Sequence, residues 1–244
     1  MKTLWSVDRF DSSIFGIKVG KLWAEKEVED TFFKQADAFF VQEQIKLVFC
    51  YAPFDVQTSF ALQKNNYYLV STRALYRQSQ LSKIDQKHNQ LITLVDTYQY
   101  LSNTCFFAEI ARDLAIVSHY AKDPFIPLRY AISLYDQWIH NTYHGYAQQV
   151  WTALDENGKP VGFISLKKHE EKIIIDLLAV HQKARGQGIA SLLLSQACAL
   201  AQDEKKPLYV STQVENIPAV RLYEKNGFLL ESIDLVYHKK MNGE

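Results

Sequence analysis

The sequence contains few cysteines, and their spacing fits neither a disulfide framework nor a zinc site. Only three are present in 244 residues, Cys50, Cys105 and Cys198. Small secreted proteins carry even numbers of closely spaced cysteines, and zinc sites place them in short pairs. The thiols are therefore expected to stay reduced, and we predict a cytoplasmic protein without a bound metal.

The sequence also lacks an excess of charge of either sign. Twenty-seven lysines and arginines balance 27 aspartates and glutamates, and the isoelectric point is about 7.1. A protein that binds DNA or RNA through its phosphates gathers positive charge on one surface. The balance of charge therefore argues against nucleic acid as a partner.

Long apolar runs are absent too. The first nine residues reach a charge before a hydrophobic signal segment can begin. The longest nearly uncharged run with a helical pattern, 188–202, is shorter than the roughly 20 apolar residues that cross a bilayer, and it contains Ser191, Ser195 and Gln196. We therefore expect no secretory signal and no transmembrane span.

The pattern of apolar residues predicts alternating strands and helices, and hence an α/β fold. Hydrophobic residues make up 48% of the chain and charged residues 22%, as in ordinary globular domains. The polar stretch 79–89 is interpreted as a linker, which predicts a small N-terminal α/β domain at residues 1–88 and a second domain at 89–244. In the first domain we expect strands at 14–22, 45–51 and 67–76 and helices at 28–44 and 56–64.

The second domain is expected to be a mixed sheet flanked by helices. Its strongest turn signal is the segment Asp155-Glu156-Asn157-Gly158, which joins two predicted strands as a hairpin. Hairpins followed by a strand-helix-strand-helix unit indicate an α+β mixed sheet. The predicted strands are 91–95, 149–154, 161–168, 173–180, 208–214, 228–231 and 233–238, and the predicted helices are 105–114, 128–144, 188–202 and 217–226.

Two glycines lie within three residues at a predicted strand-to-helix turn, in the segment Arg185-Gly186-Gln187-Gly188-Ile189-Ala190. The whole chain has only nine glycines, so this pairing is unusual. Such a turn presents free backbone N–H groups and the positive end of a helix dipole, and both favour a pyrophosphate. The alternative is that the glycines only relieve a tight connection. The glycine fingerprints of dinucleotide-binding and nucleoside-triphosphate loops are not matched.

A second group of residues follows in the predicted helix 217–226. Asn216 and Tyr223 are seven residues apart, which is two helical turns, so both side chains are expected to point to nearly the same side. Together they can line a cleft. The alternatives are that Asn216 is a simple helix N-cap and that Tyr223 is a core aromatic.

Both segments resemble the conserved motifs of the GNAT N-acetyltransferase superfamily: 175–190 resembles its acetyl-coenzyme A motif, and 216–228 its C-terminal motif. The resemblance implies the acyl-CoA N-acyltransferase fold for the second domain and acetyl-CoA as co-substrate. It implies that backbone amides in the glycine turn bind the pyrophosphate and that the preceding strand pairs with the pantetheine arm. The residues expected at the coenzyme are Leu178, Ala179, Val180, Arg185, Gly186, Gln187, Gly188, Ile189, Ala190, Asn216 and Tyr223.

The resemblance also implies catalytic roles. Tyr223 corresponds to the tyrosine that protonates the departing thiolate, and a phenol with a pKa near ~10 still carries its proton at neutral pH. A base must free the acceptor amine, and Asp176, the only charged residue in strand 173–180, is our candidate, with His181 next. His140 and His144 have the spacing of metal ligands but no third ligand near them, so no metal is predicted.

The segments 10–16, 118–123, 129–131 and 138–145 are similar to corresponding regions of dTDP-fucosamine acetyltransferases. This resemblance implies a nucleotide-linked amino sugar, like dTDP-4-amino-4,6-dideoxygalactose, as acceptor, with contacts from Phe15, Tyr120, Arg129 and Trp138. Two alternatives stay open: a protein N-terminal or lysine acetyltransferase, and a CoA-binding module without catalysis. The sequence does not decide whether the chain forms a homodimer.

Overall fold

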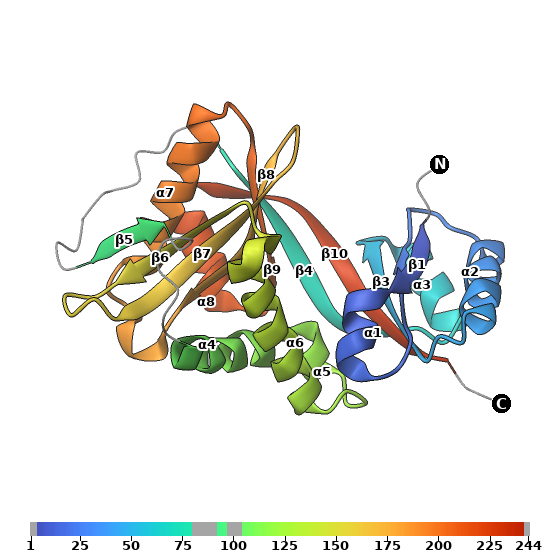
Figure 1. Cartoon of the computed structure of the whole chain (residues 1–244). Helices are drawn as coiled ribbons and strands as arrows, with labels where there is room; N and C mark the ends of the chain where they lie inside the picture. The colour runs from blue at the N-terminus through green and yellow to red at the C-terminus, as the bar shows by residue number, and fades with distance from the viewer. Residues whose placement is uncertain (1–3, 80–91, 97–103, 242–244) are drawn as a thin grey trace.

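A single ten-stranded mixed sheet runs through both halves of the chain (Figure 1). The computed structural model describes residues 4–79, 92–96 and 104–241. Neighbouring strands follow the order β1-β2-β3-β10-β4-β9-β8-β7-β6-β5. The predicted mixed α/β sheet is confirmed.

The first half matches the predicted pattern except at its start. Residues 14 and 15 were expected in a strand, but they end helix α1, and the strand begins only at Val19. Local signals explain the helix: the Asp8 carboxylate caps it by accepting from the N–H of Asp11, and Gly16 ends it in the left-handed region at φ 66°. The elements are β1 (Trp5–Asp8), α1 (Arg9–Phe15), β2 (Val19–Trp23), α2 (Asp30–Gln42), β3 (Leu47–Pro53), α3 (Val56–Lys64) and β4 (Tyr68–Gln78).

The second half contains β5 (Thr93–Asp96), α4 (Thr104–Ile116), α5 (His119–Lys122), α6 (Leu128–Asn141), a π-helical segment (Thr142–Tyr146), β6 (Gln149–Leu154), β7 (Pro160–Lys168), β8 (Ile173–Val180), a 3-10 turn (Gln182–Ala184), α7 (Ile189–Asp203), β9 (Leu208–Gln213), α8 (Ile217–Lys225) and β10 (Phe228–Lys240). Two predictions here are wrong in detail. The helix expected to reach residue 144 ends at Asn141, before a kink where Gly145 has φ 95°. The two strands expected at 228–231 and 233–238 form one, with a bulge between Leu230 and Ser232.

Strand β10 lies in the middle of the sheet and pairs antiparallel with β3 on one side and with β4 on the other. Strand β4 in turn pairs with β9, so hydrogen bonds continue from the N-terminal strands into the C-terminal ones. Figure 1 shows β4 and β10 as the long strands that join the two parts of the molecule. The domain boundary at residues 88 and 89 remains a prediction, since those residues lie outside the described chain, as does nearly all of the predicted linker.

Two hydrophobic clusters cover opposite faces of strands β7 and β8. On one face Ile164 and Ile175 pack against Leu193 of α7. On the other, Phe163 and Leu177 pack against Ile110 of α4. Phe163 and Ile164 alternate as strand neighbours do, whereas Ile175 and Leu177 reach opposite faces because the pairing of β8 shifts between them. The two clusters therefore hold the carboxyl end of β8 between helix layers.

The structure also bears on the state of the cysteines, on metal ligands and on membrane-spanning helices. Cys50 and Cys198 are buried free thiols, and the side chain of Cys105 lies outside the described part. Across residues 4–79, 92–96 and 104–241, no three potential metal ligands come together. Within the same ranges no helix is both long enough and apolar enough to cross a membrane.

Candidate active site

Strands β8 and β9 separate at the carboxyl end of β8. Their parallel pairing covers Ile173 to Ile175 on β8, whereas β8 continues to Val180 and stays paired with β7 on its other edge. The β9-facing edge of residues 176–180 is therefore unpaired by strands in the described chain. An unpaired edge offers backbone N–H and C=O groups to an extended ligand, as in strand addition. Leu178, Ala179 and Val180, which are predicted to lie beside a pantetheine arm, belong to this edge.

The two glycines of the turn after β8 have left-handed backbones, with φ 78° at Gly186 and 81° at Gly188. A Cβ atom added at either position would meet no protein atom within 4 Å. Both glycines therefore face open space. Gly188 also caps α7, whose first N–H groups have no intrahelical acceptors. The turn has the features of an anion site at a helix N-terminus.

Two side chains fix this turn to helix α4. The Arg185 guanidinium donates to the carbonyl of Val180 at 3.0 Å and to the Asp113 carboxylate at 2.5 Å. His181 pairs with the Glu109 carboxylate at 2.5 Å. Arg185 thus acts on the turn through its side chain, while its backbone remains available for the predicted ligand contact.

Tyr223 lies on α8, in the same buried cluster as Ile175 of β8 and Val210 of β9, and it is not among the cavity-lining residues. It is buried and packs against Tyr76 and Phe228, with ring centroids 5.8 Å apart in each case. Burial raises the pKa of its phenol, so the proton stays in place at neutral pH. Asn216 occupies the N-cap position of α8, but its side chain does not cap the helix and instead donates to Thr212 at 3.3 Å. The simple-cap interpretation of the Asn216 side chain is therefore wrong.

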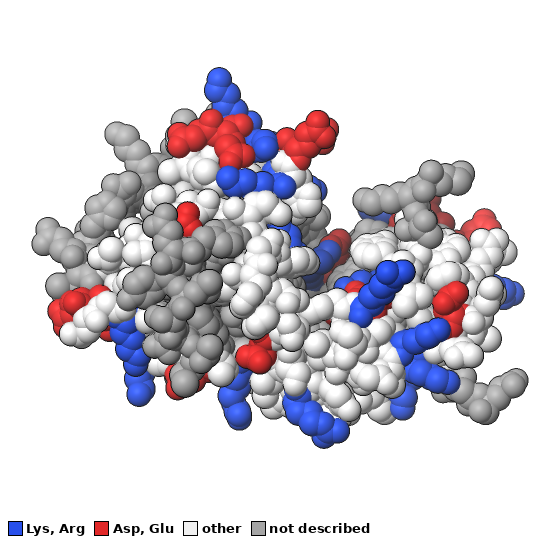
Figure 2. Space-filling view, in the orientation of Figure 1, with Lys and Arg blue, Asp and Glu red and all other residues white. Residues whose placement is uncertain are grey.

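A cavity of about 550 Å³ joins the β8–β9 gap to the N-terminal strands. In Figure 2 the surface is hollowed between the two parts of the molecule. Most of the large side chains on its wall are aromatic. The lining residues include Asp8, Asp11, Lys21, Trp23, Tyr51, Arg73, His119, Tyr120, Trp138, Lys167 and Asp176.

The charged groups of the cavity are arranged in opposite pairs. Lys21 pairs with Asp8 and, at 3.5 Å, with Asp11. Arg73 donates to Asp234 at 2.7 Å. These ion pairs give the cavity a strongly polar wall.

Asp176 lies at a bulge in β8, where the pairing with β7 shifts by one residue. One carboxylate oxygen pairs with Lys167 at 2.9 Å, and the other accepts from the Trp138 indole at 2.9 Å. Burial lowers the pKa of Lys167, but its hydrogen bonds to Asp176 and Tyr146 raise it above the ordinary value. Both oxygens of Asp176 already accept from a donor, one of them the Lys167 ammonium, so a proton taken up from an amine would weaken that ion pair. The base role of Asp176 stays a prediction.

Asp11 is a buried carboxylate in this cavity. It is 1% exposed, and burial raises its pKa to about 6 although Lys21 opposes the shift. The Tyr120 hydroxyl donates to it at 3.2 Å. Asp11 therefore changes charge near neutral pH.

Replacing Asp11 with asparagine is expected to remove a pH-dependent cost to stability. The folded pKa exceeds the unfolded value, so the unfolded state binds fewer protons between about pH 4 and 6, and wild-type stability falls as the pH rises through this window. Relative to wild type, the free energy of unfolding of the variant should rise by on the order of 2 kcal/mol between pH 4.5 and pH 7.5. Urea unfolding at both pH values measures this difference. Parallel stability curves would contradict the assignment.

The predicted acceptor residues separate into two groups. Tyr120 and Trp138 line the cavity. Phe15 is buried among aromatic rings, and Arg129 is exposed and lies over the ring of Tyr130. Neither residue is among those that line the cavity. Sequence reasoning missed Lys21, Tyr51, Arg73 and His119. The only signal for His119 was its place in the segment 118–123.

Comparison with known proteins indicates the class of protein to which residues 110–228 belong. Residues 110–228 match the model of the acetyltransferase (GNAT) family. The chain is 31% identical over 131 residues to the spore coat polysaccharide biosynthesis protein SpsD of Bacillus subtilis, covering 53% of this chain and 45% of that protein. It is 33% identical over 79 residues to the peptidyl-lysine N-acetyltransferase YjaB of Salmonella typhimurium, covering 32% of this chain and 49% of that protein.

A crystal structure of a GCN5-related N-acetyltransferase from Sphaerobacter thermophilus has the same fold, with a TM-score of 0.66 at 12% identity over 98% of this chain and 76% of the other. Residues 110–228 belong to the acetyltransferase (GNAT) family, as the two motifs predicted. The matches span less than half the length of the two curated relatives.

Proposed function

We propose that the protein transfers an acetyl group from acetyl-CoA to the amine of a nucleotide-linked amino sugar similar to dTDP-4-amino-4,6-dideoxygalactose. The observation that carries the proposal is the cavity that joins the β8–β9 gap to the N-terminal strands. The similarity to SpsD, a protein named for polysaccharide biosynthesis, supports a sugar acceptor.

The residues present fit acetyl-CoA. Both turn glycines face open space, so a pyrophosphate can approach the backbone N–H groups of 185–190. The free edge of residues 178–180 fits the pantetheine arm, which can pair with it as an added strand. The acetyl thioester would then lie near Asp176 and Leu177, where the gap opens into the cavity.

The acceptor would occupy the cavity. Aromatic faces such as those of Trp23, Tyr51 and Trp138 fit the apolar faces of a sugar ring, and the ion pairs offer partners to its hydroxyl groups and amine. Both reactants are then held with the amine next to the thioester. The bimolecular step becomes effectively unimolecular, which lowers its barrier.

The reaction is a direct transfer. The amine nitrogen attacks the thioester carbon, a C–N bond forms, the C–S bond breaks, and the nitrogen loses one proton to solvent. The Tyr223 phenol gives its proton to the departing thiolate, and its buried surroundings keep that proton available at neutral pH. Asp176, held by Lys167 and Trp138, is positioned beside the reacting groups.

The acceptor is tested by thiol release from acetyl-CoA in the presence of dTDP-4-amino-4,6-dideoxygalactose, with the product identified by mass spectrometry. We expect saturable turnover with the nucleotide sugar and little with a lysine peptide. Preferred turnover of the peptide, the chemistry in the name of YjaB, would favour a protein acetyltransferase. Binding of acetyl-CoA without turnover of either acceptor would favour a module without catalysis.

A further inference from the structure

We propose that a buried chain of side chains, Asp123–His238–His119, ends at the acceptor cavity and takes the proton from the acceptor amine at Nε2 of His119. The inference deepens the proposed function and rests on it, since it assigns the base for the same transfer. In this assignment His119 is the catalytic residue, and His238 and Asp123 position it.

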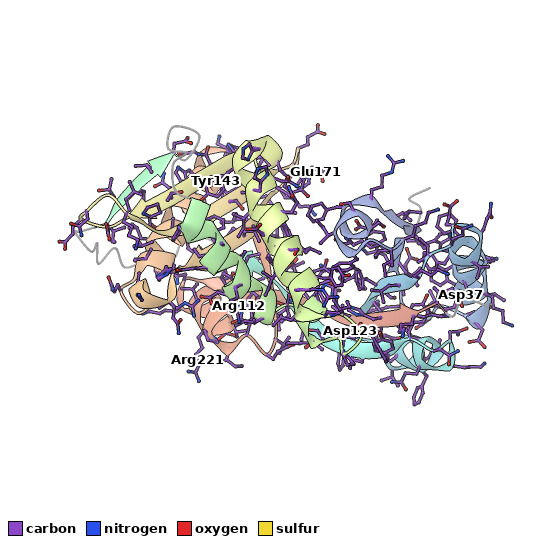
Figure 3. The ribbon with its side chains drawn as sticks, turned by 60° about the horizontal axis from the view of Figure 1, so that its bottom comes forward. Asp37, Arg112, Asp123, Tyr143, Glu171 and Arg221 are labelled. Atoms are coloured by element: carbon purple, nitrogen blue, oxygen red, sulfur yellow. The ribbon has the colours of Figure 1, made fainter. Side chains whose placement is uncertain are left out.

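The chain is continuous and connects three elements. The Nδ1 atom of His119 on α5 lies 2.9 Å from Nε2 of His238 on β10. The Nδ1 atom of His238 lies 2.6 Å from the carboxylate of Asp123, which also accepts from the Tyr68 hydroxyl at 2.9 Å. Asp123, labelled in Figure 3, lies where the connection between α5 and α6 meets β4 and β10.

All three members of the chain are nearly inaccessible to bulk solvent. His238 is 0% exposed, Asp123 2% and His119 7%. The His119 side chain is nevertheless part of the cavity wall, so it connects the buried chain with the space for the acceptor. Buried polar groups of this kind are costly unless they are paired, and this arrangement pairs them.

The hydrogen-bond directions follow from the carboxylate. Burial raises the pKa of Asp123, but hydrogen bonds from His238, the Phe125 N–H and Tyr68 lower it below its ordinary value, so the group is an acceptor. His238 must then donate from Nδ1. Burial lowers the pKa of His238 although Asp123 opposes the shift, so its ring is neutral and Nε2 carries a lone pair.

His119 must therefore donate from Nδ1 to His238. This leaves a lone pair on Nε2 of His119. Burial lowers the pKa of His119 well below its ordinary value, and His238 and nearby cations add to the shift. The hydroxyl of Tyr51 lies 3.5 Å from Nε2, on the cavity side. A neutral imidazole with a free Nε2 in a substrate cavity is the form that a base requires.

The groups around His119 oppose a lasting positive charge on it, so the imidazolium is a transient species. His119 Nε2 takes a proton from the acceptor ammonium, and the Nδ1–H of His119 keeps its hydrogen bond to His238, which in turn donates to Asp123. The free amine then attacks the thioester, and Nε2 returns its proton to solvent through the cavity that His119 lines. The charged and titratable groups facing His119 are Tyr51 from β3, His238 from β10, Lys21 from β2, Arg73 from β4, and Tyr120 and Lys122 from its own helix.

Asp176 is the competing base, and its contacts separate the two candidates. Both of its carboxylate oxygens have donors within 2.9 Å, one of them the Lys167 ammonium. The Nε2 atom of His119 has only the long contact to Tyr51 among the described residues. A proton can therefore reach His119 without breaking an ion pair.

The experiment compares His119→Gln, His238→Gln and Asp176→Asn with wild type, using acetyl-CoA and dTDP-4-amino-4,6-dideoxygalactose from pH 6 to 9.5. His119→Gln should lower kcat/KM by roughly 10²–10³-fold at pH 6.5 and recover toward wild type at high pH, where the amine is already free. His238→Gln should lose about tenfold in the same way. Added imidazole should restore part of the activity of His119→Ala.

His140→Gln is the matched control, because His140 is exposed and stacks on His144 at 4.0 Å away from the cavity. It should behave as wild type. A pH profile of His119→Gln parallel to wild type would overturn the proposal, and so would a low-pH loss that appears in Asp176→Asn alone. Circular dichroism on each variant identifies any that fails to fold, and the protonation of the histidine rings in the wild-type protein then decides for that position.

Nitrogen NMR of the wild-type histidine rings tests the same chain without an acceptor. We expect a proton on Nδ1 and none on Nε2 for both His119 and His238 at pH 7. A protonated Nε2 on His119 would overturn the proposal even if the enzyme is active. If wild type acetylates a lysine peptide but not the sugar, the acceptor proposal fails, and the same variants assayed with the peptide decide whether His119 is the base.

Discussion

Replacing Tyr223 with phenylalanine is expected to lower kcat by roughly 10²–10⁴-fold while acetyl-CoA binding stays nearly unchanged. The substitution removes only the hydroxyl, so the ring still packs against Tyr76 and Phe228. Without the phenolic proton the thiolate has to leave unprotonated, which raises the barrier of that step. Steady-state kinetics and calorimetric titration with acetyl-CoA measure the two quantities.

Tyr76→Phe is the control for this experiment, because it removes a hydroxyl from the same buried cluster. It should leave kcat near the wild-type value. A normal kcat in Tyr223→Phe would assign Tyr223 to the core alone, and loss of acetyl-CoA binding would make it a binding residue.

A Gly188→Val variant is expected to bind acetyl-CoA about 10–100-fold more weakly. A β-branched residue is strained at φ 81°, and its side chain would enter the open space in which the pyrophosphate approaches the turn. Gly16→Val is the matched control, because Gly16 also has a left-handed backbone, φ 66°, with no atom within 4 Å of an added Cβ. Both variants should lose stability, but only Gly188→Val should lose the coenzyme. Equal affinities in the two folded variants would show that the turn does not contact the ligand.

The elements around the coenzyme turn could be predicted because their signals are local. Strand 173–180 was predicted with the bounds that the structure has, and the helix after it begins one residue later than expected. An apolar run, two glycines and a helical period occur together within 30 residues there. The helix α1 also had local signals, Asp8 before it and Gly16 after it, and it was missed because its apolar residues resembled the start of a strand.

The acceptor cavity could not be predicted in the same way, because its residues meet only through long-range pairing. His119 and His238 are 119 residues apart in sequence. Neither lies in a segment whose spacing indicates a site, and a lone histidine in an apolar segment is ordinary. Strand β10 was predicted as two short strands because the polar residues 231 and 232 interrupt its apolar pattern, and the structure accommodates them as a bulge.

The position of β10 also bears on how the protein is made. Its pairing with β3 joins residues about 190 positions apart, a separation that favours slow folding. As the chain leaves the ribosome, β3 and β4 therefore wait with open edges until residues 228–240 emerge, and open edges invite pairing with other chains. Because β10 also carries His238, a chain that ends before that strand would have exposed strand edges and would lack the ring that contacts both His119 and Asp123.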